Sequence, residues 1–278
     1  MKRAGIFLLV ICAVLAMVSA GGSLARAASK AGGERFLAPA PADTPTPSFF
    51  VYMPLVLRDS GAGVWENVIE EGFETPGSLW DFWGWADPTG HLYYWARSTC
   101  QPYSGSYSAW AVGGGADGAL LSCGSTYPDN VDSWMAYGPF SLADATAASL
   151  SFKLWLNVDA VLNDYLCMYA SSDGNLYDGA CLTYQPDGWG PVTFRLDDAL
   201  TSVDMRGQPE VWIAFEFVSN ESVHFPEGAY VDDVVVRKCA GGICPTAASA
   251  GAELSAARMR RAQTVVAHPD RQLPVRGQ

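Results

Sequence analysis

Hydrophobic and polar residues alternate with a period of two along several segments of this chain. In residues 150–158 the even positions are leucine, phenylalanine or valine, and in residues 211–218 the odd positions are valine, isoleucine or phenylalanine. Successive side chains of a strand point to opposite faces, so this alternation predicts strands with one face in a core. The same argument predicts further strands at 108–112, 133–137, 164–169, 191–196 and 230–237.

Turn-forming residues separate these segments. Examples are Ser172-Asp-Gly174, Pro186-Asp-Gly188 and Arg206-Gly207. Aromatic residues make up 12% of the chain, which also holds 28 Gly and 17 Pro, a composition typical of turn-rich β proteins. About eight strands over roughly 175 residues, without a long amphipathic helix, predict an all-β fold, namely an antiparallel β-sandwich.

The beginning of the chain is predicted to be an export signal. Lys2 and Arg3 precede an apolar run at residues 5–18, and a small-residue cleavage site follows at residues 18–20 or 25–27. The run is shorter than the roughly 20 apolar residues that a membrane-spanning helix needs, and no second apolar stretch approaches that length. We therefore expect a secreted protein, extracellular or associated with the cell surface, with no membrane span in the mature chain.

Composition divides the chain into four regions. Residues 1–28 form the predicted signal peptide, and residues 29–63 form a Pro-, Ala- and Thr-rich linker that includes an apolar segment at 49–58. The β-sandwich domain is expected at residues 64–244. Residues 245–278 are predicted to be a disordered or weakly helical tail.

The cysteine count agrees with export. Of 7 cysteines, Cys12 lies in the signal, and the even number that remains predicts three disulfides in an oxidising compartment. Six cysteines allow 15 pairings, and closeness in the sequence favours Cys100–Cys123, Cys167–Cys181 and Cys239–Cys244. A zinc site is the alternative, but no cysteine pair has the two-residue spacing and no histidine lies near a cysteine.

Charge is distributed unevenly along the chain. The formal net charge is -12, and residues 64–239 hold 24 acidic side chains against 6 basic ones. This acidity argues against a nucleic-acid partner, because binding a phosphate backbone requires a basic surface. It leaves carboxylates available for a hard cation such as calcium, although solubility is the alternative role for most of them.

Several motifs follow one another in an order known from a group of extracellular modules. They are Glu71-Gly-Phe-Glu74, Tyr103-Ser-Gly-Ser-Tyr-Ser-Ala-Trp110, Leu150-Ser-Phe-Lys-Leu-Trp155, Glu210-Val-Trp-Ile-Ala-Phe-Glu-Phe217 and Gly228-Ala-Tyr-Val-Asp-Asp-Val234. Over residues 66–239 the chain resembles a MAM-type, concanavalin-like jelly roll. It is especially similar to the module that accompanies the catalytic domain of immune inhibitor A-like bacterial metallopeptidases. Their zinc-binding His-Glu-x-x-His motif does not occur in this sequence, so the resemblance concerns the accessory module alone.

The resemblance implies one structural calcium ion, held where the first and last strands of the module approach each other. Its ligands would include Glu74 from the opening motif and Asp232 and Asp233 from the closing motif. Calcium takes six to eight oxygen ligands, which carboxylates and backbone carbonyls can supply together. Asp232 and Asp233 are neighbours on a predicted strand and should point to opposite faces, so only one need bind the ion. The alternative is that both are surface carboxylates.

Two tryptophans are candidates for ligand binding. Trp155 and Trp212 lie on strand faces opposite the core-facing residues, with Lys153, Asn157 and Glu216 beside them. Tryptophan rings stack against sugar rings, and neighbouring polar groups can bind the hydroxyls. The alternative is that each tryptophan packs under a loop.

Motifs for catalysis are lacking in the sequence, which has no Gly-x-Ser-x-Gly elbow, phosphate-binding loop or zinc-protease helix. Glycoside hydrolases use two carboxylates across a cleft, and Glu216 has no recognisable partner for that role. We therefore predict a non-catalytic binding or adhesion module that recognises an extracellular glycan or protein. The alternatives that stay open are a glycoside hydrolase-like or peptidase-associated enzyme component and a structural envelope protein.

Overall fold

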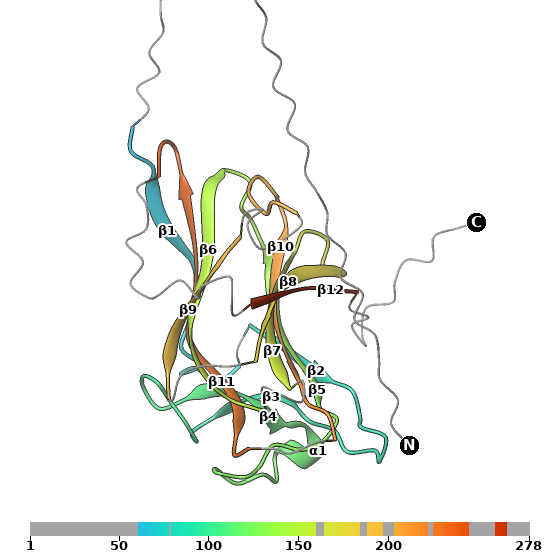
Figure 1. The fold of residues 1–278 in the computed structure, drawn as a ribbon. Coiled ribbons are helices and arrows are strands. Elements are labelled where there is room, and N and C mark those ends of the chain that lie inside the picture. Colours follow the sequence, from blue (N-terminus) through green and yellow to red (C-terminus); the bar gives the residue numbers. More distant parts are fainter. Residues whose placement is uncertain are drawn as a thin grey trace, which may run out of the picture. The chain divides into compact units, whose positions relative to one another are not determined.

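The strands form two antiparallel sheets that pack against each other (Figure 1). The computed structural model describes residues 61–77, 79–159, 164–183, 188–196, 203–221, 225–244 and 259–265. The predictions for the signal peptide, for Cys12 and for the apolar segment 49–58 concern residues outside these ranges.

Each sheet contains six of the described strands. The first runs in the order β3 (Tyr94–Ser98), β4 (Ser108–Gly114), β11 (Gly228–Ala240), β6 (Ala145–Asn157) and β9 (Gly190–Arg195), and β1 (Val64–Glu71) also pairs with β11. The second runs in the order β12 (Met259–Val265), β8 (Leu176–Leu182), β7 (Tyr165–Ser171), β10 (Val211–Val218), β5 (Asp132–Phe140) and β2 (Asp81–Gly84). The predicted fold class, an all-β antiparallel β-sandwich, is confirmed.

Helix contributes little to the described part of the chain. The helix α1 (Gly115–Gly118) is one turn long and follows β4 directly. Among the residues that the structure describes, no helix has the length and apolar character needed to cross a membrane.

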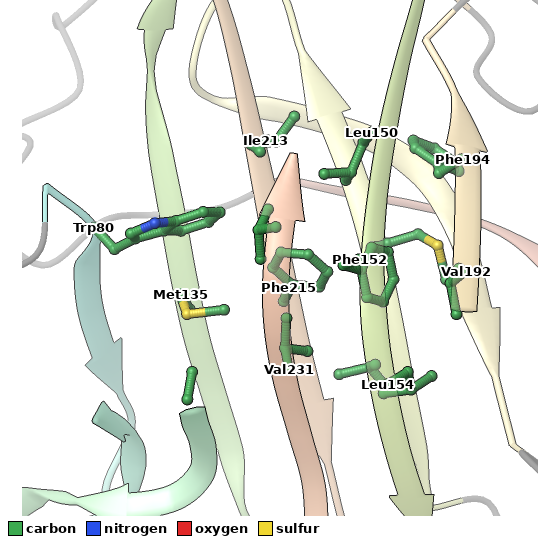
Figure 2. Close-up of a cluster of buried hydrophobic side chains, with 14 of the residues drawn as sticks. Trp80, Met135, Leu150, Phe152, Leu154, Val192, Phe194, Ile213, Phe215 and Val231 are labelled. Atoms are coloured by element: carbon green, nitrogen blue, oxygen red, sulfur yellow. The ribbon is translucent and has the colours of Figure 1, made fainter. Parts of the chain in front are cut away.

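The core lies between the two sheets and is built from the alternating residues (Figure 2). Phe152 of β6 meets Phe215 of β10, which comes from the opposite sheet, and Leu154 belongs to the same cluster. The Phe215 ring lies 4.9 Å from the Phe152 ring, edge to face, and 5.9 Å and 6.3 Å from the rings of Trp80 and Trp95. Burial of these rings removes a large apolar area from water, which drives the packing of the sheets.

The predicted strands correspond to β4, β5, β6, β7, β9, β10 and β11. The strands β1, β2, β3 and β8 were not predicted. In β8 the alternation is interrupted by Asp178 and Gly179. A side chain at Gly179 would collide with the backbone carbonyl oxygen of Met168 on β7, so the close approach of the two strands requires glycine there.

The strand β12 corrects the prediction for the tail at residues 245–278. Residues 259–265 are neither disordered nor helical, because they form a strand that pairs antiparallel with β8, from Met259 opposite Leu182 to Val265 opposite Leu176. The N–H and C=O groups along the edge of a sheet are satisfied by a further strand. Here that ladder outweighs the helix preference of an Ala- and Arg-rich segment.

The three predicted disulfides are all present, as Cys100–Cys123, Cys167–Cys181 and Cys239–Cys244. The second joins directly opposed residues of β7 and β8. The third closes the end of β11, where Ile243 accepts a hydrogen bond of 2.9 Å from the backbone N–H of Gly63. The disulfide therefore secures the place where the residues just before β1 meet those just after β11.

We expect β12 to protect the edge of the second sheet. A chain that ends after Cys244 would leave the outer backbone groups of Leu176–Leu182 unpaired, and exposed strand edges associate with other strands. Light scattering coupled to gel filtration should therefore detect larger species for this chain than for a control chain that ends at residue 267. Equal masses for the two proteins at every concentration would contradict the expectation.

Candidate functional site

The five predicted ligand-binding residues occupy two surfaces rather than one. Lys153, Trp155 and Asn157 lie on the outer face of β6 in the first sheet, which points away from the core between the two sheets. Trp212 and Glu216 lie on the corresponding face of β10 in the second sheet. The two faces are on opposite sides of the sandwich, so a single binding platform built from all five residues is not formed.

Three partly exposed rings gather on the outer face of the first sheet, and we call this set the aromatic corner: Tyr103, Trp155 and Trp189. The Trp155 and Trp189 rings lie 6.4 Å apart with their planes at 84°. The Trp189 and Tyr103 rings lie 5.7 Å apart at 62°. Tyr103 is 45% exposed, and the two tryptophans are partly exposed.

Two buried rings support the aromatic corner from the side. Tyr230 of β11 is directly opposite both Trp155 of β6 and Trp110 of β4, so the three side chains lie on the same face. The Trp110 and Tyr230 rings stack at 5.5 Å, and Trp110 donates a hydrogen bond of 2.6 Å from Nε1 to the carbonyl oxygen of Glu227. Cross-strand neighbours of this kind stabilise a sheet, and here they hold Trp155 in place.

Asp232 positions the loop that carries Tyr103. Its Oδ2 accepts hydrogen bonds from the backbone N–H groups of Tyr103 and Ser104, at 2.9 Å and 3.1 Å, and its Oδ1 accepts one from Asp233 at 2.7 Å. The side chain is fully buried, and burial raises the pKa of the carboxyl although the N–H donors act in the opposite direction. Asp232 is thus an anchor for the loop backbone.

Asp233 corrects the expectation that the two neighbouring aspartates point to opposite faces. The register of β11 against β6 shifts between Asp232 and Val235, and Asp233 has a positive φ of 46°. Its Oδ1 accepts a hydrogen bond of 2.7 Å from the hydroxyl of Ser104, the same residue whose N–H binds Asp232. Alternation does not hold at this point of β11, because the irregularity turns both side chains toward one loop.

Glu74 holds the other end of the same loop. Its Oε1 accepts hydrogen bonds of 2.9 Å from the backbone N–H groups of Ser106 and Tyr107. Gly105 has a φ of +60°, and a side chain there would collide with the Glu74 carboxylate. Arg97 donates to the carbonyl oxygen of Glu74 at 2.7 Å, which fixes the turn that presents this carboxylate.

All three carboxylates predicted to bind calcium therefore contact the loop at residues 103–107. Their oxygens are directed at backbone N–H groups and a hydroxyl. Within the described ranges no three His, Cys, Asp or Glu side chains are grouped so that they could hold a metal ion. The carboxylates as they lie do not form a metal cage, and calcium binding there stays a prediction.

The outer face of the second sheet carries a buried aromatic cluster, of which only Trp212 was predicted as a site residue. The rings of Trp83 and Trp134 stack at 5.9 Å with their planes at 10°, and those of Trp134 and Tyr169 stack at 5.5 Å with their planes at 12°. Trp134 and Tyr169 are each 2% exposed, and Trp212 is 8% exposed. Because the ring faces are used within the cluster, this surface offers little aromatic area to a ligand.

Glu216 lies within this aromatic cluster and accepts a hydrogen bond of 2.8 Å from the hydroxyl of Tyr169. Burial raises the pKa of the Glu216 carboxyl to about 7, and the charge of Asp132 acts in the same direction. Asp132 accepts a hydrogen bond of 2.8 Å from Nε1 of Trp134, and burial raises the pKa of Asp132 as well. Both carboxylates are thus integrated in the packing of the cluster.

Lys153 and Trp155 belong to the aromatic corner and its surroundings, and Asn157 lies further along β6, where it donates a hydrogen bond of 3.1 Å to the carbonyl oxygen of Pro226. Tyr103 and Trp189 were not predicted. Both come from segments between strands, where no periodic pattern exists, and only their aromatic character marks them in the sequence.

No protein-family model and no curated protein matches this chain. Among solved structures, an adhesin domain of Lys-gingipain from Porphyromonas gingivalis aligns at 18% identity with a TM-score of 0.37, covering 62% of this chain and 98% of that one. A family 11 carbohydrate-binding module of a cellulosomal cellulase from Clostridium thermocellum aligns at 13% identity with a TM-score of 0.36, covering 66% and 98%. These likenesses concern the fold alone, and at such TM-scores they carry no information about the ligand.

Glu216 should make the stability of the protein depend on pH. The folded-state pKa of about 7 lies above the ordinary value of 4.5, so the folded protein binds this proton more tightly than the unfolded chain. The stability contributed by the protonated carboxyl is complete below the ordinary pKa and is lost as the pH rises through about 7. A pKa difference of one corresponds to about 1.4 kcal/mol, so the loss at pH 8 is on the order of 1–3 kcal/mol.

Thermal unfolding followed by circular dichroism between pH 5 and pH 8 measures this loss. Glu216→Gln keeps the size of the side chain and stays neutral, so its Tm should depend less on pH and exceed that of the unsubstituted protein at pH 8. Glu210→Gln, at an exposed position just before β10, is the matched control and should leave the pH profile unchanged. An unchanged profile in Glu216→Gln would refute the assignment.

Proposed function

We propose that this protein is a secreted, non-catalytic binding module whose aromatic corner binds an extracellular glycan. The observation that carries the proposal is the set of three partly exposed rings at Tyr103, Trp155 and Trp189, with Lys153 close by. Aromatic faces stack on the apolar faces of sugar rings, and nearby polar groups bind sugar hydroxyls. We also propose a relationship to MAM-type modules, supported by the order of the sequence motifs.

The contacts that Tyr230 and Asp232 make with the aromatic corner and its loop favour a preformed site. Trp155 packs against Tyr230 at 6.2 Å, and the loop of Tyr103 is held by the buried Asp232. A ligand therefore meets rings that are already ordered, which lowers the entropy lost on binding. Secretion is supported by the predicted signal peptide and by the three disulfides, which persist in oxidising compartments.

The proposal that the protein binds a glycan without cleaving it can be tested with an activity assay. Glu216, the candidate for a glycosidase carboxylate, lies on the opposite sheet from the aromatic corner, within the buried aromatic cluster. A glycan held at the aromatic corner is thus remote from this carboxyl. Purified protein incubated with polysaccharides should retain them and release no reducing sugar, whereas release of sugar would favour the glycoside hydrolase alternative.

Substitution of the rings tests the glycan site. In a polysaccharide binding screen on the disulfide-bonded protein, we expect Trp155→Ala and Trp189→Ala each to weaken binding by roughly five- to thirtyfold, because a stacked ring contributes on the order of 1–2 kcal/mol. Trp85→Ala is the matched control, since Trp85 is 40% exposed but lies outside the aromatic corner. Unchanged binding in both ring variants, with unchanged melting temperatures, would refute the site.

Structural calcium at Glu74, Asp232 and Asp233 is a further part of the proposal, and its support is the resemblance of the opening and closing sequence motifs to those of calcium-stabilised jelly rolls. A bound ion would stabilise the folded state by mass action. We expect calcium to raise the Tm of the chelator-treated protein by several degrees and to have a smaller effect on Glu74→Gln. Equal melting with calcium and with chelator would exclude this part while leaving glycan binding untouched.

A further inference from the structure

Lys153 has an unusual position for a lysine in an acidic domain. Its Nζ lies 4.7 Å from the centre of the Tyr103 ring, at the edge of the aromatic corner. Among the described residues Lys153 takes part in no ion pair, whereas Lys238, for example, pairs with Glu66 and Asp144. A cation–π contact orients the ammonium group but leaves its charge uncompensated.

The neighbouring carboxylate is directed elsewhere. Asp232 is directly opposite Lys153 in the ladder between β11 and β6, so the two side chains lie on the same face. An ion pair between them would be expected, yet both Asp232 oxygens accept backbone N–H groups instead, from Tyr103, Ser104 and Asp233. The hydrogen bonds that position the loop therefore leave the lysine available for a ligand.

We propose that the glycan bound at the aromatic corner carries an acidic group, a carboxylate or a sulfate, that pairs with Lys153. This inference rests on the proposed function and specifies its ligand class. A sugar that stacks on one ring of the aromatic corner has some of its substituents beside Tyr103. The Lys153 ammonium lies next to the Tyr103 ring and can therefore meet those substituents. A charge-assisted hydrogen bond between ammonium and acid is stronger than a neutral one.

The geometry and the charge of the surface limit further which glycans can bind. The ring planes meet at 84° and 62°, so they cannot lie together on a flat crystalline surface and instead suit a single glycan chain. The surrounding domain is strongly acidic, with 24 acidic against 6 basic side chains in residues 64–239. Its field repels dense polyanions and is screened within about 8 Å at physiological salt. A chain with spaced acidic groups therefore fits better than a densely charged one.

Matched pairs of polysaccharides test the inference with the mature, disulfide-bonded protein. The probes are a xylan with spaced glucuronic acid side groups and its carboxyl-reduced form, and a sparsely sulfated galactan and its desulfated form, each titrated at physiological salt. We expect at least one acidic member to bind about tenfold more tightly than its neutral counterpart. The two pairs distinguish a carboxylate from a sulfate as the recognised group.

Variants of Lys153 assign the preference to this residue. Lys153→Gln should remove the preference for the acidic member and retain the weaker binding of the neutral one, while Lys153→Arg should keep the preference. Lys238→Gln is the matched control for the loss of one lysine and should behave like the unsubstituted protein. Circular dichroism and melting temperature establish that each variant is folded.

Each outcome separates this inference from the proposed function. Equal binding of acidic and neutral members would overturn the acidic ligand but leave a glycan-binding module. A preference that persists in Lys153→Gln would overturn the role of Lys153. Binding of none of the four probes, together with a negative general glycan screen, would overturn both, and a protein partner would then be the occupant to seek.

Discussion

The packing of the two sheets around Phe215 is the contact on which the rest of the molecule depends. The ring lies between residues of both sheets, 4.9 Å from Phe152 and 5.9 Å from Trp80, and it is completely buried. Once these faces are joined, the alternate residues of every strand must point outward. The aromatic corner on one side and the buried aromatic cluster on the other both follow from this division.

Acidic residues in this protein also have local structural roles. Asp232 and Glu74 use their carboxylates as anchors for backbone N–H groups of the loop at residues 103–107, and Glu216 is packed among rings. A carboxylate that accepts several N–H groups can be buried at lower cost than an unpaired one. The consequence for function is indirect: the anchored loop presents Tyr103, and Lys153 beside it has no ion pair with any of the described residues.

The candidate site was predictable to the extent that it lies on one strand. Lys153 and Trp155 share a face of β6 by simple alternation, and the structure keeps them together. Trp212 and Glu216 follow the same rule on β10, but alternation does not reveal which sheet a strand joins, and these two lie on the far side. Tyr103 and Trp189 come from loops, whose positions depend on contacts distant in sequence, so no local pattern could place them beside Trp155.

The sequence by itself determined the all-β class, most of the strands and the three disulfides, because strand alternation and cysteine spacing depend on neighbours along the chain. Only the tertiary structure decided the order of strands in each sheet, the pairing of β12 with β8 and the shared loop of Asp232 and Asp233. The reason is that these features arise from hydrogen bonds between residues far apart in the chain. A register shift such as that after Asp232 reverses the side-chain direction that alternation predicts, and the ladder with β6 sets that shift.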